Sequence, residues 1–439
     1  MHLRTRALIE PAFGAVARPF QAFFRLEAAS GILLLAAAAV ALAWANSPFA
    51  ASYVSFFATP LSVGAGSLGF DFSLLDLVNE GLMTVFFFVV GLEIKRELAI
   101  GELSSPASVA LPAFAALGGM VVPAAIFAAL NAGGEGAAGW GVPMATDIAF
   151  AVGAPSLLRR RAPHALVVFV TALAILDDIG GIVVIALFYG HGLSLGWLAA
   201  AAGFAAIAVA LGRAHARSGL AYAAAGAALW WALHHAGIHA TIAGVVLGLA
   251  VPARPRRAAG ELLRELCVHA TRLAEEKASD EELRAAELLG IEARIEQLGS
   301  PLARFEHALH PWVAFGVMPL FALANSGVSL SGLGPSDLVG PVALGVGLGL
   351  VVGKTLGVFG LSLLAVRLGV ATLPAGVSPA KLLGASILTG IGFTVALFIA
   401  ALAYPDAPPL LAQAKVGILV GSLVAGVGGS LVLRGTRPV

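Results

Sequence analysis

The chain has 439 residues, of which 59% are hydrophobic and 12% are charged, and its mean hydropathy is +0.93. A soluble domain contains about 25% charged residues, so most of this chain is expected to face lipid or other apolar helices. The formal net charge of +1 gives no reason to expect nucleic-acid binding, and the single Cys267 excludes an internal disulfide.

The first predicted element is a membrane span near residues 28–46. Arg18 and Arg25 precede this apolar run, and Ala43-Trp44-Ala45 has the pattern of a signal-peptide cleavage site. The run is nevertheless longer than the apolar region of a signal peptide, and further spans follow it. We therefore expect an uncleaved first helix after a cytoplasmic segment, 1–27.

Twelve apolar runs are candidates for membrane spans, each of which needs about 20 apolar residues or somewhat fewer where the helix is broken. The runs near 138–158 and 238–252 are the least regular. The sequence predicts an all-α membrane protein of about twelve transmembrane helices, near 28–46, 74–94, 107–130, 138–158, 164–188, 194–212, 219–236, 238–252, 311–328, 338–365, 382–403 and 413–433.

Basic residues predict the orientation of these spans. Of the 26 lysines and arginines, 24 precede the first span or follow every second span, and the alternate connections contain none. The positive-inside rule places both termini and the basic connections in the cytoplasm. We expect a multi-pass protein of the bacterial inner membrane, in contact with lipid, with spans 1–8 in 28–252, spans 9–12 in 311–433 and a cytoplasmic tail, 434–439.

The connection 253–310 differs from the others because it is long and charged. Its stretches 261–266 and 291–296 place charges at helical spacing, which predicts one or two amphipathic cytoplasmic helices. Two interpretations stay open for residues 253–305: a loosely constrained insert or a regulatory domain.

Four charges fall deep inside predicted spans, at Asp147, Asp177, Asp178 and Lys354, and Glu80 lies at a shallower position. Ionisable groups in the hydrocarbon core are costly and usually functional. Consecutive helical residues point about 100° apart, so Asp177 and Asp178 can face different partners. We expect Lys354 to pair with one of them. A purely stabilising ion pair is the alternative, but it leaves the second aspartate and Asp147 unexplained.

Charge balance suggests what such a site binds. Three carboxylates and one lysine sum to −2 when all are ionised, and the site then needs protons or a small cation to be stable in a membrane. Oxygen ligands favour hard ions over soft metals. Competition between these cations, combined with alternating access, is sufficient for antiport, and no cofactor is expected.

Two predicted triplets of spans, 107–188 and 338–433, have opposite orientations and are candidates for inverted repeats. Glycine and proline interrupt the middle span of each triplet, and interrupted spans in corresponding positions are typical of a transporter's ion site. We expect two discontinuous, crossing helices, with Asp147 offsetting positive helix ends and Lys354 offsetting negative ones. Glycine is also common in membrane helices for packing alone.

Seven motifs occur along the chain: Gly91-Leu-Glu-Ile-Lys-Arg-Glu-Leu98, Met144-Ala-Thr-Asp-Ile-Ala-Phe150, Ala174-Ile-Leu-Asp-Asp-Ile-Gly180, Ile238-His-Ala-Thr-Ile-Ala-Gly244, His310-Pro-Trp-Val313, Gly353-Lys-Thr-Leu-Gly357 and Gly390-Ile-Gly-Phe-Thr394. With these motifs, in this order, the chain resembles the NhaA-type sodium/proton antiporter family. The resemblance implies Asp178 as the principal sodium ligand, with Asp177 and Thr146 near it. It also implies that Asp177 pairs with Lys354, and that Asp147 and Lys354 balance the crossed half-helix ends.

The resemblance further implies a cytoplasmic pH-sensing cluster of Glu93, Lys95, Arg96, Glu97, Glu306, His307 and His310. Carboxylates and histidines near the inner face can titrate near neutral pH, although an ordinary solvated helix end would carry similar charges. Connection 47–73 resembles an external hairpin that helps to form a homodimer. Two features depart from the family: Glu80 stands where a shorter aspartate is expected, and residues 253–305 are longer.

The predicted function is secondary exchange of sodium or lithium for protons, electrogenic if two carboxylates take up protons for each sodium. A sodium-coupled symporter of an organic anion is the main alternative, but no arginine inside a span is free to bind the anion. A membrane scaffold with structural ion pairs is a second alternative. An enzyme is the least favoured class, because no nucleophile–base set or metal cluster is apparent.

Overall fold

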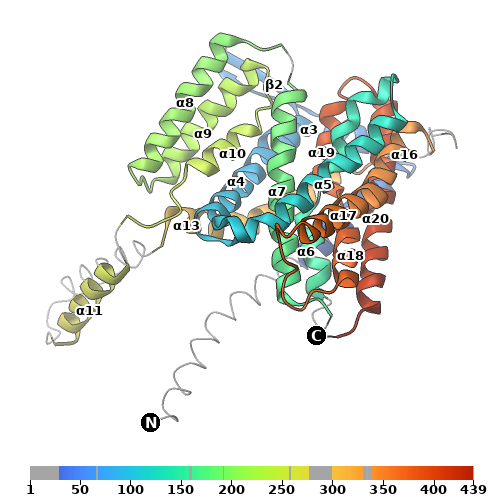
Figure 1. The fold of residues 1–439 in the computed structure, drawn as a ribbon. Coiled ribbons are helices and arrows are strands. Elements are labelled where there is room, and N and C mark those ends of the chain that lie inside the picture. The colour runs from blue at the N-terminus through green and yellow to red at the C-terminus, as the bar shows by residue number, and fades with distance from the viewer. Residues whose placement is uncertain are drawn as a thin grey trace. The chain divides into compact units, whose positions relative to one another are not determined.

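Helices form nearly all of the regular structure (Figure 1). The structure, a computed structural model, describes residues 29–65, 68–157, 161–190, 192–256, 259–275, 299–329, 334 and 339–438. The described residues form two compact units. Unit 1 contains the chain up to Met83, Glu102–Tyr189 and the chain from Ala314, and unit 2 contains Thr84–Gly101 and Gly190–Val313.

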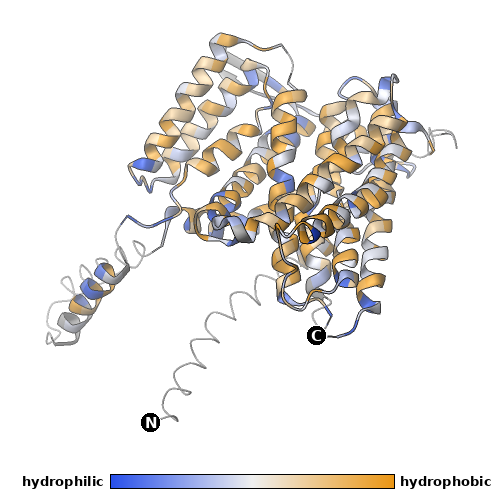
Figure 2. Ribbon diagram, viewed as in Figure 1, coloured by the Kyte–Doolittle hydropathy of each residue, from blue (hydrophilic) through white to orange (hydrophobic). Residues whose placement is uncertain are grey.

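The composition of the helices is that of a multi-pass membrane protein. Among the described residues, seven helices are long and apolar enough to cross a membrane, or up to nine if each of two bent pairs is one span. The bent pairs are Ala29–Ala45 with α2 (Ala50–Phe57), at 117°, and α18 (Pro379–Leu388) with α19 (Phe393–Ala403), at 45°. Hydrophobic residues cover most of these helices, as Figure 2 shows.

In unit 1, a β-hairpin follows α2. Strands β1 (Pro60–Ala65) and β2 (Leu68–Ser73) pair antiparallel from Pro60↔Ser73 to Ala65↔Leu68. The 47–73 connection, expected by resemblance to form an external hairpin, therefore contains a helix and a β-hairpin; its role in a dimer stays a prediction. A capping box of Ser73 and Asp76 starts α3 (Leu74–Asp76), and the π-helical turn η1 (Leu77–Leu82), which contains the half-buried Glu80, follows.

The other elements of unit 1 include four of the seven long apolar helices, each of them close to its predicted range. They are η2 (Glu102–Ser104), α5 (Pro106–Leu130), η3 (Glu135–Met144), α6 (Ile148–Leu157), α7 (His164–Phe188), α14 (Met318–Asn325), α16 (Pro341–Leu348), η5 (Gly349–Gly353), α17 (Lys354–Arg367), α18, α19 and α20 (Pro408–Gly435). The span predicted near 138–158 is therefore two elements rather than one helix.

The backbones of α5 and α17 approach closely where Gly118 faces Gly357. A Cβ atom added at Gly118 would lie 2.1 Å from the carbonyl oxygen of Gly357, and one at Gly357 would lie 2.0 Å from the carbonyl oxygen of Gly118. Only glycine permits this distance, and such small-residue contacts are the usual way in which membrane helices pack. The contact supports the position of Lys354, which begins α17.

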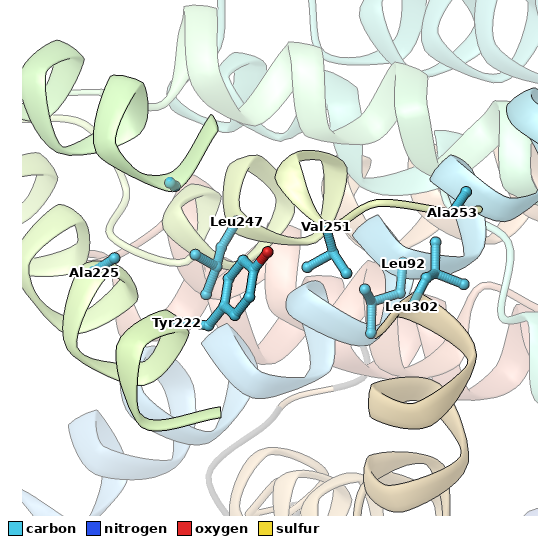
Figure 3. Packing of buried hydrophobic residues seen from close by; sticks show 8 residues of the cluster. Leu92, Tyr222, Ala225, Leu247, Val251, Ala253 and Leu302 are labelled. Atoms are coloured by element: carbon cyan, nitrogen blue, oxygen red, sulfur yellow. The ribbon is translucent and has the colours of Figure 1, made fainter. Parts of the chain in front are cut away.

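Unit 2 contains most of α4 (Met83–Ile100), α8 (Leu195–Arg213), α9 (Gly219–Ala236), α10 (Ile242–Ala250), α11 (Ala259–Glu275) and α13 (Pro301–Trp312); the π-helical turn η4 (Val313–Val317) follows α13. Figure 3 shows its buried cluster, in which Tyr222 of α9 and Leu247 of α10 lie with Leu92 of α4 and Leu302 of α13. The span predicted near 238–252 is the shorter helix α10. Helix α11 agrees with the first amphipathic helix predicted in 253–310, whereas 291–296 lies outside the described residues.

Candidate ion-binding site

Two helices of unit 1 are interrupted where the sequence predicted. The first, near 138–158, consists of the 3-10 helix η3 and the helix α6, with Ala145–Asp147 non-helical between them. The second consists of α18 and α19, separated by residues 389–392. Pro143 lies just before the first break, and Gly390 and Gly392 lie in the second; both residue types are poor helix formers. Both predicted discontinuities are confirmed.

The two breaks contact each other directly. The backbone N–H of Asp147 donates a hydrogen bond of 2.7 Å to the carbonyl oxygen of Ile391. The hydroxyl of Thr146 lies 3.0 Å from the carbonyl oxygen of Thr389, which caps the C-terminal end of α18. The last carbonyls of a helix lack partners within that helix. Each break therefore satisfies backbone groups that the other leaves open.

Asp147 lies at the N-terminal end of α19, where Thr394 is in the first turn. Asp147 Oδ2 accepts hydrogen bonds from the backbone N–H of Thr394 at 3.1 Å and from the hydroxyl of Thr394 at 2.5 Å, and Asp147 is 2% exposed. A helix N-terminus carries roughly +0.5 charge. The contact thus agrees with the prediction that Asp147 offsets a positive helix end. The hydroxyl of Ser422, on α20, accepts the neighbouring N–H of Phe393 at 3.3 Å.

The predicted ion pair of Lys354 is present, with Asp177 as its partner. Lys354 Nζ lies 2.5 Å from Asp177 Oδ2, and neither side chain is exposed. The hydroxyl of Thr146 lies 2.8 Å from the same oxygen. The expected role of Lys354 in offsetting negative helix ends, such as the C-terminal end of α18, stays a prediction. Thr146 contacts that end through the Thr389 carbonyl, because its short side chain lies in the break itself.

The second carboxylate oxygen of Asp177 has a different environment. Asp177 Oδ1 is buried and has no hydrogen-bond partner among the described residues. Buried polar atoms are nearly always paired, so such an oxygen calls for an explanation such as a bound ion or water. Asp178 follows on α7, is 6% exposed, and points about 100° away around the helix. The donors gathered here are carboxylate, hydroxyl and carbonyl oxygens, which suit a hard cation.

The expected pH-sensing residues lie in unit 2, on α4 and α13. Arg96 is ion-paired with Glu306 and lies 3.1 Å from Glu97, and Glu93 interacts electrostatically with the same guanidinium. The structure therefore gathers three of the other predicted residues, Glu93, Glu97 and Glu306, around Arg96. His310 lies one turn beyond Glu306 and interacts with Arg96 and His307, whereas Lys95 forms no ion pair within the described part of the chain.

Comparison with known proteins decides the family. The family model described as Na+/H+ antiporter 1 matches residues 21–433. The chain belongs to this antiporter family. It is 62% identical to the Na(+)/H(+) antiporter NhaA of Anaeromyxobacter sp. (strain Fw109-5) over 98% of this chain and 94% of the relative. It is 53% identical to the Na(+)/H(+) antiporter NhaA 1 of Myxococcus xanthus (strain DK1622), over 98% and 96% of the two chains.

A third relative of the Na+/H+ antiporter 1 family extends the likeness to a more distant sequence. The Na(+)/H(+) antiporter NhaA of Oleidesulfovibrio alaskensis is 49% identical over 95% of this chain and 93% of the relative. The family match includes every residue of the two charged clusters described above.

Proposed function

We propose that the chain exchanges sodium or lithium for protons across the bacterial inner membrane. The observation that carries this proposal is the buried oxygen Asp177 Oδ1, for which the described residues supply no hydrogen-bond partner, beside the hydroxyl of Thr146 and the ammonium of Lys354. Asp178 is the principal sodium ligand, with Asp177 and Thr146 beside it. The names of the antiporter relatives support exchange of sodium for protons.

The mechanism follows from competition at these oxygens. Asp177 Oδ2 is occupied by Lys354 and faces the Thr146 hydroxyl, so Oδ1 is the oxygen of Asp177 that is available to sodium. A proton and a sodium ion neutralise the same carboxylates and cannot both occupy them. Binding of sodium at Asp178 therefore releases the proton that this carboxyl group held, and binding at Asp177 displaces Lys354, so that the Asp177–Lys354 pair separates during the cycle. If two carboxylates release protons for each sodium bound, exchange moves net charge.

Twelve spans with both termini in the cytoplasm, arranged as inverted repeats, are part of this proposal. The alternation of basic connections supports the topology. The repeats 107–188 and 338–433 are supported by the two broken elements, which occupy corresponding positions and bond to each other at Asp147 and Ile391. Crossed half-helices near the midplane allow the site to open to one side at a time.

Sodium-driven exchange by the purified protein in proteoliposomes tests the function. An imposed sodium gradient should change the internal pH, and the apparent KM for sodium should rise as the pH falls because protons compete for the carboxylates. A potassium diffusion potential set with valinomycin should alter the rate if exchange is electrogenic. Sodium-dependent uptake of a labelled organic anion without proton movement would favour a symporter instead.

Regulation by pH is proposed for the cluster around Arg96. Arg96→Gln removes the positive charge that Glu306 and Glu97 share, so repulsion between these carboxylates should move the midpoint of the pH–activity profile toward higher pH, by about one unit. Measuring exchange from pH 6 to 9 checks this. Lys95→Gln is the matched control, since it removes one cation from the same helix end. Equal profiles in both variants would argue for an ordinary solvated helix end.

A further inference from the structure

The 3-10 helix η3 is unusually long. It contains ten residues, Glu135–Met144, whereas 3-10 runs of more than about four residues are uncommon because their hydrogen-bond geometry is poor. Its last residue is separated only by Ala145 from Thr146 and Asp147. The position of η3 therefore determines where these two site residues lie. A segment with such weak internal hydrogen bonding needs contacts from outside to fix it.

Two tyrosine hydroxyls supply those contacts. Tyr404 Oη donates to the carbonyl oxygen of Gly136 at 2.6 Å, and Tyr189 Oη donates to the carbonyl oxygen of Ala138 at 2.8 Å. Tyr189 Oη also accepts the backbone N–H of Gly141 at 3.3 Å. The two tyrosines are 2% and 5% exposed. Both buried hydroxyls thus form hydrogen bonds with the backbone of η3.

The glycines of η3 are needed for this approach. A Cβ atom at Gly139 would lie 2.1 Å from Tyr404 Oη and 2.8 Å from Tyr404 Cζ. A Cβ atom at Gly141 would lie 2.9 Å from Tyr189 Oη. Real Cβ atoms do not approach other atoms so closely, so the tyrosines reach the η3 backbone only because these positions lack side chains.

Each tyrosine also ends a helix that builds the ion site. Tyr189 caps the C-terminal end of α7, twelve residues after Asp177, and Tyr404 caps α19, ten residues after Thr394. At 1.5 Å per residue these are distances of about 18 Å and about 15 Å along the helices. The three segments that meet at the breaks are therefore joined a second time at their far ends.

We propose that Tyr189 and Tyr404 are positioning residues that hold η3 against α7 and α19, and so set Thr146 against the carboxylate of Asp177 and Asp147 against Thr394. This inference rests on the proposed function. Burial raises the pKa of Tyr189 to about 12, and burial together with Tyr189 raises the pKa of Tyr404. Both hydroxyls therefore stay protonated over the pH range in which exchange is measured, so their hydrogen bonds to η3 are present at every pH used.

The test replaces single hydroxyls. Tyr404→Phe and Tyr189→Phe should each raise the apparent KM for sodium about three- to tenfold, the usual effect of one lost hydrogen bond, and the double variant should raise it further. Maximal rate, melting temperature and the midpoint of the pH profile should stay close to wild type. Tyr222→Phe is the matched control, because Tyr222 is 1% exposed and its hydroxyl has no partner within the described residues.

Three outcomes would overturn the proposal: an unchanged KM in both variants, an equal rise in the Tyr222→Phe control, or a fall in melting temperature and maximal rate at constant KM. The last result would mean that the hydroxyls only stabilise the fold. Failure of the wild-type protein to exchange sodium for protons would instead refute the proposed function. In that case, the change of melting temperature with sodium concentration would still give the apparent sodium affinity of each variant. The positioning role of the two tyrosines would be judged from those affinities.

Discussion

Asp178→Asn is expected to abolish sodium-driven proton exchange, with a fall of at least about 100-fold in rate at a sodium concentration below the wild-type KM. The amide matches the carboxylate in shape but carries no charge, so it can neither neutralise sodium nor take up a proton. Removing one partner of a buried charge interaction costs about 3–5 kcal/mol, which is more than a factor of 100 in binding. Asp178 is 6% exposed, so water replaces the lost charge poorly.

The measurement is the internal pH of proteoliposomes after a sodium jump, with protein content matched. Asp406→Asn is the control for expression and insertion, because Asp406 is exposed and lies beyond the end of α19. The control should exchange at the wild-type rate, and both variants should melt near the wild-type temperature. Full exchange by Asp178→Asn would show that the principal sodium ligand is assigned to the wrong carboxylate.

The ranges of long helices were predictable where local signals mark both ends. Helix α7 occupies 164–188 as predicted, because Pro163 precedes it and a Tyr-Gly-His-Gly stretch follows. Helix α9 occupies 219–236, between the Ser218 cap and Gly237, which has φ +79°. Apolar runs without such signals mislead: α13 begins at Pro301, ten residues before the predicted span, because charged residues of its first turns hide the helix.

The charged members of the site were predictable, and their uncharged partners were not. Burying Asp147, Asp177 and Lys354 is costly enough to stand out from any apolar sequence. Thr394 and Ser422, which cap α19, are ordinary hydroxyl residues of a membrane helix, and only packing brings them to the break. The prediction that Lys354 pairs with Asp177 rather than with Asp178 rests on the family resemblance, since helix geometry allows either pair. Nothing in the sequence indicates that 135–144 is a 3-10 helix.

Lys354→Ala is expected to have the largest effect on stability. It leaves Asp177 as a buried carboxylate whose remaining hydrogen-bond donor is the Thr146 hydroxyl, and breaking a buried pair in this way costs about 3–5 kcal/mol. The melting temperature should therefore fall clearly, and exchange should be strongly reduced.

The double variant Asp177→Asn/Lys354→Gln separates the charge imbalance from the loss of packing. Both replacements are neutral and able to hydrogen-bond, so the double variant should recover most of the melting temperature that Lys354→Ala loses. Exchange should stay impaired, because Asp177 no longer competes for sodium and protons. A double variant as unstable as Lys354→Ala would mean that the lysine stabilises the fold through its packing beside Gly119 of α5, and not through its charge.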